Sequence, residues 1–430
     1  MNEPVVILGA GLTGLSTAYH LNKDYHIFEK ENEVGGLCRS YRVDGFTFDY
    51  TGHLLFLKNP LIKKLVVDLI GDNLIKHQRK SWVYLKNQLI KFPFQANFGS
   101  LPDSIAKECL GDFIFTYGYN QGKNYTNLLK WLENRFGKGL TGCFLRPYNQ
   151  KMWKVPLSGI TLDWVDKFIP QPDLNEVIDG VLDIGQKRYG YNTEFFYPKK
   201  GGIFSLPLAF KKGVKNLHLD EEVSEIFLGK KLIRFKSGNE VLFSRIVSTI
   251  PLPELLEIIK DIPVEIKSKA KDLQYTSVYN INLGVDKKCG PGVHWIYLPE
   301  KRYPFYRFGF GSKFSKFMAP EGRSSIYVEI SYSPGKPFNK KGMLANTIEK
   351  LTELKVISNK IDINVVKILD IKYAYIIYNL ARQRYLKSIL DYLESQGIFS
   401  CGRYGAWEYS SMNDAIYCGM NIAKKINETM

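Results

Sequence analysis

The chain has 430 residues, of which 45% are hydrophobic and 24% are charged. These proportions are those of soluble globular proteins and exclude a disordered or fibrous chain, and the length predicts two or three packed modules. Lysine and arginine outnumber aspartate and glutamate by 59 to 43, which gives a net charge of +16, a field that attracts nucleic acid, anionic lipid or a phosphorylated small molecule.

The positions of the charged residues and of the cysteines narrow the kinds of partner and site that we expect. The lysines are scattered and form no basic run with interleaved aromatic residues, so we interpret them as a solvated surface and expect no nucleic-acid partner. The six cysteines form neither a C-x-x-C pair nor a Cys/His cluster. We therefore expect reduced thiols, a cytoplasmic location and no metal site. The first apolar run, Val5 to Leu8, lacks a basic flank and is too short for a signal or a span, so we expect no integral membrane segment.

Residues 4 to 29 predict one βαβ unit. The apolar run at residues 5–8 precedes glycines 9, 11 and 14, amphipathic spacing from Leu15 to Leu21, and a second strand that ends at Glu29. In a G-x-G-x-x-G turn of this context the first glycine permits the turn, the second admits a pyrophosphate, and the third lets helix and strand pack. The helix N-terminus attracts the anion, and Glu29 is expected to accept hydrogen bonds from ribose hydroxyls.

The residues after this unit favour FAD over NAD as the tightly held cofactor. Lys30 and then Gly35-Gly36-Leu37-Cys38-Arg39-Ser40 follow Glu29, and this extension resembles the FAD-binding amine-oxidase-like superfamily. Residues 197–202 and 219–223 are similar to two further segments of that superfamily. The resemblance places Val223 beside the adenine.

The remaining elements suggest three domains. Strand patterns at 81–85 and 88–92 predict a hairpin that turns at Lys86-Asn87, and residues from Pro102 to about Gly190 follow helical periods. Runs at 277–284, 294–298 and 325–332 predict an antiparallel sheet, and a strand at 397–400 with a following helix returns to the first unit.

We therefore predict an α/β fold with a discontinuous Rossmann-type FAD domain, an inserted helical domain and an antiparallel β-sheet domain. The boundaries that we expect are 1–74 with 195–262 and 395–430 for the FAD-binding domain, 98–194 for the helical substrate-side domain, and 75–97 with 263–394 for the sheet domain.

Ordered segments over nearly the whole chain resemble the UDP-galactopyranose mutase family, in its eukaryotic type. The segments are Asp49–Phe56, His77–Trp82, Phe92–Gln95, Arg146–Trp153, His294–Glu300, Pro304–Arg307, Tyr373–Tyr375, and Gly402–Tyr409 with Asn413 after it. The resemblance implies interconversion of the pyranose and furanose forms of a nucleotide sugar, above all UDP-galactopyranose to UDP-galactofuranose for cell-surface glycans. In that family the flavin must be reduced, by NADPH or NADH, and it attacks the anomeric carbon through N5.

The resemblance also implies a role for individual residues. The catalytic residues would be His53, Arg307 and Arg403. The substrate would be bound by Phe56, Phe92, Gln95, Arg146, Asn149, Trp295, Tyr297, Arg307, Tyr375, Arg403, Tyr409 and Asn413. FAD would be bound by Gly9, Gly11, Gly14, Glu29, Gly36, Arg39, Gly52, His53, Val223, Gly402, Arg403 and Asn413, and the nicotinamide cofactor by Arg79 and Ser81.

The residue types fit this chemistry independently. A nucleoside diphosphate carries about two negative charges, and arginines bind its oxygens bidentately as lysine cannot. Arg307 and Arg403 are the candidates for such a clamp. Tyrosine hydroxyls suit the same phosphates, although any single tyrosine among 27 can equally be a core residue.

Two departures from the family and two other functions stay open. Phe92 stands where the family has tyrosine, so one hydroxyl contact would be missing, and residues 112–140 do not align with the region that should hold the nucleobase. The chain can therefore act on another nucleoside diphosphate sugar. It can also be a flavin oxidase or desaturase of the amine-oxidase type, against which Arg79, Arg307 and Arg403 argue. A non-enzymatic flavoprotein has no sequence feature in its favour, and the sequence indicates no particular oligomeric state.

Overall fold

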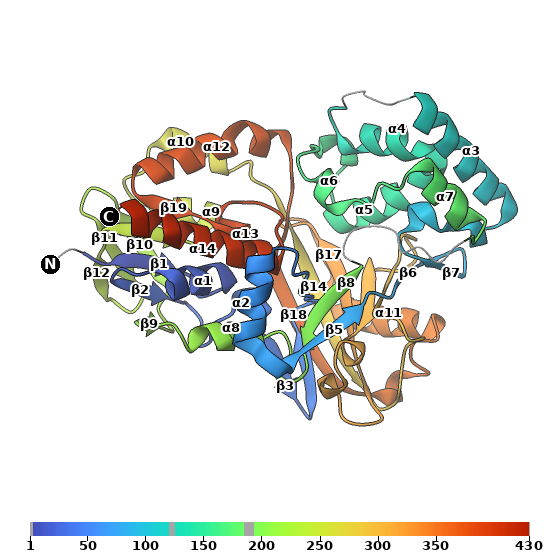
Figure 1. Ribbon diagram of the computed structural model, residues 1–430, viewed down its shortest axis with the longest axis horizontal. Helices are drawn as coiled ribbons and strands as arrows, with labels where there is room; N and C mark the ends of the chain where they lie inside the picture. The colour runs from blue at the N-terminus through green and yellow to red at the C-terminus, as the bar shows by residue number, and fades with distance from the viewer. Residues whose placement is uncertain (1–2, 120–124, 185–192, 430) are drawn as a thin grey trace.

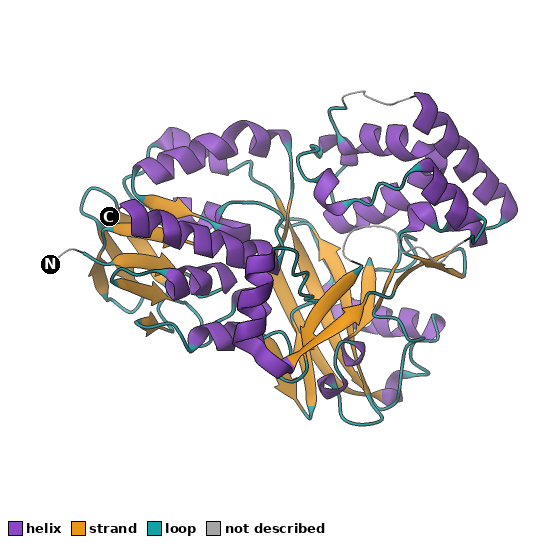
Figure 2. Ribbon diagram, viewed as in Figure 1, coloured by secondary structure: helices purple, strands orange, loops and turns teal. Residues whose placement is uncertain are grey.

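The computed structural model describes residues 3–119, 125–184 and 193–429. Figures 1 and 2 show an α/β module that holds both chain ends, a large sheet beside it, and a separate group of helices above the far end of that sheet. None of the helices in the described ranges is long and apolar enough to cross a membrane.

A five-stranded parallel sheet forms the core of the α/β module. Its order is β19-β13-β1-β2-β9, and its strands are β1 (Val5–Leu8), β2 (Tyr25–Phe28), β9 (Leu217–His218), β13 (Arg245–Ser248) and β19 (Ile398–Ser400). All four residues of β1 are buried, as a central parallel strand requires. The three stretches of chain in one sheet confirm the predicted discontinuous domain.

Alternate residues of β1 face two different layers. Val5 and Ile7 belong to a core with α1 (Leu12–His20), α8 (Ser205–Lys211) and α14 (Met412–Thr429). Val6 and Leu8 face a second core, because successive side chains of a strand point to opposite faces. That second core is completed by α9 (Leu252–Ile258), α10 (Val264–Ala270), α12 (Leu380–Ser395) and the three-stranded sheet β10 (Val223–Phe227), β11 (Leu232–Phe235) and β12 (Glu240–Leu242).

The large sheet has seven strands in the order β18-β14-β17-β16-β15-β6-β7. They are β6 (Ser81–Leu85), β7 (Gln88–Lys91), β14 (Tyr275–Val285), β15 (Trp295–Tyr297), β16 (Arg307–Phe310), β17 (Ser324–Tyr332) and β18 (Ile363–Ile376). The predicted hairpin is present, with Lys86 and Asn87 both at positive φ in its turn. The expectation of an antiparallel sheet holds for every pair except β15 and β6, which are parallel, because the hairpin from early in the chain joins the later strands edge to edge.

The helical group contains α3 (Asp103–Tyr119), α4 (Leu128–Leu140), a π-helical turn (Thr141–Leu145), α5 (Arg146–Trp153), α6 (Val165–Phe168) and α7 (Leu174–Val181). It confirms the predicted helical insertion, of which residues 120–124 and 185–192 lie outside the described ranges. The group packs around its own apolar core, which includes Phe94, Leu132, Phe136 and Trp153.

Smaller elements join these parts. Two ribbons pair β3 (Ser40–Val43) with β4 (Phe46–Asp49), and β5 (Leu74–Gln78) with β8 (Glu194–Pro198). The other helices are α2 (Pro60–Ile70), α11 (Lys340–Glu353) and α13 (Gly402–Gly405). Short helical turns lie at Gly36–Cys38, Gly71–Asn73, Phe94–Ala96, Phe98–Ser100, Leu157–Gly159, Gly311–Lys313, Lys316–Met318 and Lys360–Asp362.

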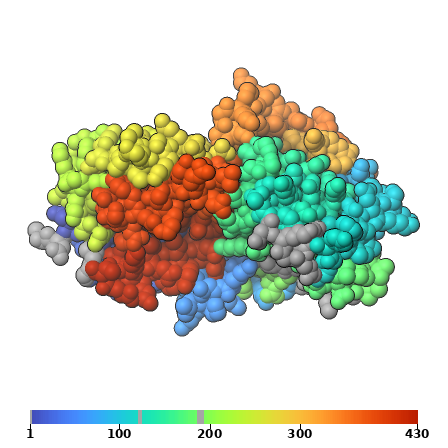
Figure 3. All heavy atoms as spheres, turned by 90° about the horizontal axis from the view of Figure 1, so that it is seen from above, coloured from blue at the N-terminus to red at the C-terminus, as the bar shows by residue number. Residues whose placement is uncertain are grey.

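The helical group also touches the C-terminal helices. Figure 3 shows its teal atoms against the red atoms of the C-terminal part. Lys167 pairs with Asp414 at 2.7 Å, and the Gln383 amide donates to Asp163 at 3.4 Å. The α/β module, the large sheet and the helical group thus enclose a common space.

Candidate functional site

A cavity of about 990 Å³ runs between these parts, at the upper end of the range of small-molecule pockets. One end is lined by the glycine turn after β1 and by Val223, and the other by Trp295, Arg307 and Tyr409. The predicted site residues that line it are Gly9, Gly11, Glu29, Gly36, Gly52, His53, Phe56, Arg79, Val223, Trp295, Tyr297, Arg307, Tyr375, Gly402, Arg403 and Tyr409.

The three glycines of the turn have different surroundings. Gly9 has a φ of +97°, which favours glycine. A Cβ on Gly14 would lie 1.9 Å from the Gly9 carbonyl oxygen, so this glycine is needed for helix α1 to pack on the strand. A Cβ on Gly11 would meet no atom within 4 Å. The open space beside Gly11, at the N-terminus of α1, fits the pyrophosphate of a dinucleotide cofactor.

Glu29 lies immediately after β2 and is held by backbone groups. Its carboxylate accepts hydrogen bonds from Ala10 N–H at 2.8 Å and Glu31 N–H at 3.1 Å. Burial raises the pKa of Glu29, while these two N–H donors act to lower it. Glu29 lines the cavity at the end of β2, which is where dinucleotide-binding folds carry the acidic residue that binds a ribose.

His53 lies in the cavity wall on the loop after β4. Burial, together with the charges of Arg403 and Arg307, lowers the pKa of His53 to about 4 against the opposing effect of Glu329. The imidazole is therefore neutral at pH 7. Gly52 beside it has no room for a side chain, because a Cβ would lie 2.5 Å from the Tyr327 hydroxyl.

Arg307 is held by a buried carboxylate that the sequence analysis did not single out. The Arg307 Nε and Nη2 atoms donate to the two oxygens of Glu329 at 2.9 and 2.8 Å. Glu329 is fully buried in β17 and also accepts from Gly52 N–H at 3.4 Å. A charge within the apolar run Ile326–Ile330 was the sequence signal for this role, because a glutamate in a buried strand needs a partner.

Arg403 enters the same end of the cavity from α13. Its Nη1 and Nη2 atoms each donate to a carbonyl oxygen at 2.7 Å, of Ser410 and Ala374. Among the described residues its buried Nε has no partner, and Arg403 forms no ion pair with them. Its guanidinium lies 4.6 Å from the centre of the Tyr409 ring. A positive charge fixed by neutral groups is suited to bind an anion.

Tyrosines surround the two arginines. Tyr297, Tyr375 and Tyr409 line the cavity, and Tyr306 joins them with its hydroxyl 3.1 Å from that of Tyr375. Tyr148 packs edge-on against Tyr297 with ring centres 5.4 Å apart. Their hydroxyls provide donors for phosphate or sugar oxygens.

Some predicted site residues lie outside the cavity lining: Gly14, Arg39, Ser81, Phe92, Gln95, Arg146, Asn149 and Asn413. Several of them hold neighbouring groups instead. Arg39 donates to Gly36 O and Tyr50, and Asn413 accepts from Asn59 N–H. The Asn149 side chain bonds Leu145 O and Trp153 Nε1.

The substrate-side members of this set differ in exposure. Arg146 is exposed, Ser81 is buried, and Gln95 is buried with its Nε2 donating to Pro170 O at 2.8 Å. The Phe92 ring lies between the Arg79 guanidinium, 4.9 Å away, and the Tyr297 ring, 5.0 Å away. Direct ligand contacts by these residues stay predictions.

No cluster of three or more His, Cys, Asp or Glu side chains that could hold a metal occurs within the described part of the chain. The hydrogen-bond donors of the cavity lining include backbone N–H groups, arginines and tyrosines. They match an anionic organic cofactor and an anionic substrate.

Comparisons with known proteins agree on a flavoprotein fold. The family described as flavin containing amine oxidoreductase matches residues 12–427. Coproporphyrinogen III oxidase of Staphylococcus aureus (strain NCTC 8325 / PS 47) is 35% identical over 100 residues, which are 22% of this chain and 22% of that protein. The 4,4'-diapolycopene oxygenase of Methylomonas sp is 25% identical over 327 residues, 66% of this chain and 63% of that protein. The matches thus span less than two thirds of these curated relatives.

Solved structures add a finer likeness. The crystal structure of a reduced UDP-galactopyranose mutase matches with a TM-score of 0.94 and 27% identity, covering 100% of this chain and 95% of that one. Putrescine oxidase bound to putrescine matches with a TM-score of 0.67 and 14% identity, covering 99% of both chains. The likeness to putrescine oxidase shows a shared fold and nothing more.

Proposed function

The chain belongs to the flavin containing amine oxidoreductase family, and from this premise we propose that it is an FAD-dependent mutase of nucleotide sugars. The expected reaction interconverts UDP-galactopyranose and UDP-galactofuranose, with no net redox change. The observation that carries the proposal is that Arg307 and Arg403 line one cavity together with the tyrosines Tyr297, Tyr306, Tyr375 and Tyr409. A carotenoid or an amine has no anionic group that would need these arginine and tyrosine donors.

The residues present fit FAD. The free space at Gly11 accepts the pyrophosphate, Glu29 the ribose hydroxyls, and Val223 lies where the adenine is expected. When bound and reduced, the flavin supplies the electron-rich group that acts on the sugar. We place NADPH or NADH, as the reductant, at Arg79, which lines the cavity, and at the nearby Ser81.

The protein's own contribution is to bind and orient. Arg403 holds the diphosphate with an unpaired charge, and Arg307, oriented by Glu329, holds it from β16. The departing diphosphate thus stays close enough to return, and the neutral His53 adds no competing cation. The tyrosine rings, of which that of Tyr306 is fully buried, keep water away from the reacting sugar.

The direct test is to incubate the dithionite-reduced protein with UDP-galactopyranose and separate the products by chromatography. The proposal predicts UDP-galactofuranose from reduced protein and none from oxidised protein. Equal turnover by oxidised protein would contradict a role for the reduced flavin, and the absence of furanose product would contradict the substrate.

The curated relatives favour a second candidate, an oxidase or desaturase, because they include a coproporphyrinogen III oxidase, a 4,4'-diapolycopene oxygenase and a 4,4'-diapophytoene desaturase. An oxygen electrode separates the two functions. A mutase consumes no oxygen in proportion to product, whereas an oxidase does.

A further inference from the structure

The loop between β15 and β16 is short and both of its ends are in the cavity wall. Tyr297 is the last residue of β15 and Arg307 is the first of β16, and the two are paired across the strands. Both line the cavity. The position of loop 298–306 therefore determines where a tyrosine and an arginine of the site lie.

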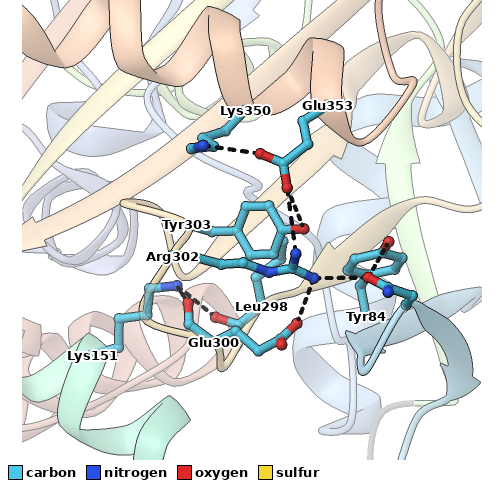
Figure 4. A network of polar contacts seen from close by, with 9 residues as sticks. Tyr84, Lys151, Leu298, Glu300, Arg302, Tyr303, Lys350 and Glu353 are labelled. Carbon is cyan, nitrogen blue, oxygen red and sulfur yellow. Dashed lines mark hydrogen bonds and ion pairs between the residues drawn. The ribbon is translucent and has the colours of Figure 1, made fainter.

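A lysine from the helical group holds this loop from below. Lys151, in α5, donates from Nζ to Leu298 O at 2.8 Å and to Glu300 O at 2.9 Å (Figure 4). Burial, together with the charge of Lys154, lowers the pKa of Lys151 to about 7 against the opposing effect of Glu300. Carbonyl oxygens accept hydrogen bonds from an amine in either protonation state, so the bonds do not depend on the charge.

The opposite side of the loop is held by surface residues. Arg302 donates to Asn87 of the β6–β7 turn at 2.8 Å and lies 3.5 Å from Glu353 of α11. Figure 4 shows Lys151 with its two carbonyl contacts at one end of this network, Arg302 in its middle, and Glu353 on the far side of Tyr303. The Arg302 and Glu353 side chains are 43% and 39% exposed, so their pairing is screened by water.

Helix α5 is attached to the large sheet by other bonds as well. Thr276 Oγ1 donates to Trp153 O at 2.9 Å, and Ser333 Oγ donates to Lys154 O at 3.3 Å. The same helix carries Tyr148, which packs edge-on against Tyr297 and Tyr306. Loss of the Lys151 bonds would therefore leave α5 in place but release the loop beside it.

We propose that Lys151 is a positioning residue, which fixes loop 298–306 against α5 and so sets the places of Tyr297 and Arg307 in the site. It acts through the loop backbone and touches no substrate. The inference rests on the proposed function only for the identity of the ligand, because the loop's order can be measured without any substrate.

The test compares Lys151→Met with Arg302→Met in flavin-loaded full-length protein. Each change keeps an unbranched apolar chain and removes the hydrogen bonds from one side of the same loop. Hydrogen–deuterium exchange of peptides that cover 298–306 should rise strongly in Lys151→Met and little in Arg302→Met. The KM for UDP-galactopyranose should rise about tenfold or more in Lys151→Met alone, with flavin retained.

Two further variants keep the test decisive. Lys151→Arg retains donors on a longer chain and should restore part of the lost affinity for UDP, measured by calorimetry. If Lys151→Met fails to fold, Lys151→Gln, which keeps one N–H donor group, takes its place in the same comparison. Unchanged exchange in 298–306, or equal effects of the Lys151 and Arg302 changes, would overturn the proposal. A protein with no mutase activity but with the expected exchange would instead contradict only the proposed function.

Discussion

The two arginines of the site reach the same cavity in different electrostatic states. Arg307 is paired bidentately with the buried Glu329, whereas Arg403 is held by two carbonyl oxygens. The sequence predicted both arginines but not the carboxylate, because a partner on a neighbouring strand is set by sheet register, here Arg307 opposite Glu329. Residue types indicated the chemistry, and only the fold shows which charges are already compensated.

This difference predicts unequal losses of stability. Arg307→Ala leaves the Glu329 carboxylate buried without its cationic partner and should lower the free energy of unfolding by about 3–5 kcal/mol. Arg403→Ala leaves no buried charge without its partner and should lower the free energy of unfolding by less. Urea unfolding followed by circular dichroism measures both. Adding Glu329→Gln to Arg307→Ala should recover a large part of the loss, and an additive further loss would contradict this account.

Arg307→Ala and Arg403→Ala should weaken ligand binding to a similar degree. Each removes a charged hydrogen-bonding partner of a diphosphate, worth roughly 1.5–3 kcal/mol, or about ten- to a hundredfold in affinity. Calorimetry with UDP on flavin-loaded protein measures the effect. Lysine at either position should restore little, because a point charge does not bind two oxygens in one plane. If both alanine variants bound UDP as tightly as the parent protein does, the proposed arginine clamp and the proposed substrate class would both be contradicted.

His53 should contribute to the pH dependence of stability. Its pKa is about 4 in the folded chain against 6.5 for an ordinary histidine, so the unfolded state binds more protons between these values. Stability is then full above pH 6.5 and is lost as the pH falls toward 4, by about 3 kcal/mol at most. Urea unfolding at several pH values should show a smaller loss over this range in His53→Gln. Identical slopes would contradict the depressed pKa.

Among the helices and strands, those with a clear short-range sequence pattern were predicted correctly. The βαβ unit and the β6–β7 hairpin are where spacing and turn residues placed them. Strand β18 was not predicted, although its alternating burial is visible, because its exposed face carries a mixture of polar and apolar residues. The parallel pairing of β6 with β15 depends on contacts far apart in sequence, which local pattern does not encode.

The glycine turn offers a matched pair of substitutions. Gly14→Ala places a Cβ 1.9 Å from a backbone oxygen and should lower both stability and flavin content. Gly11→Ala has free space within the protein and a φ of −71° that alanine adopts readily. It should keep nearly the parental melting temperature of the flavin-free protein yet bind flavin more weakly, because its methyl group enters the space for the pyrophosphate. Full flavin content in Gly11→Ala, read from absorbance, would contradict the placement of the cofactor.

On the scale of the whole molecule, the C-terminus closes the module that the N-terminus begins. Helix α14 packs along α1, and Ser16 Oγ donates to Ile416 O at 2.7 Å across 400 residues of sequence. The close approach depends on Gly419, where a Cβ would lie 2.4 Å from Thr13 O. The pattern of the last forty residues indicated the return of the chain, whereas the glycine contact required the structure. Packing between the chain ends therefore supports the first turn of α1 and the cavity beside it.

The direction in which Gly419→Ala shifts the melting temperature tests whether the site depends on the packing of α14 against α1. Alanine is the better helix former by about 1 kcal/mol, so the change should stabilise α14 unless its packing on α1 is lost. We expect a lower melting temperature and weaker flavin binding, since the Cβ would also lie 2.8 Å from Ser16 Cβ. Gly111→Ala is the control, because Gly111 is exposed in helix α3 and a Cβ there meets no atom within 4 Å. That variant should melt at an equal or higher temperature with flavin unchanged. If Gly419→Ala behaved like Gly111→Ala, the junction of the two chain ends would not support the cofactor site.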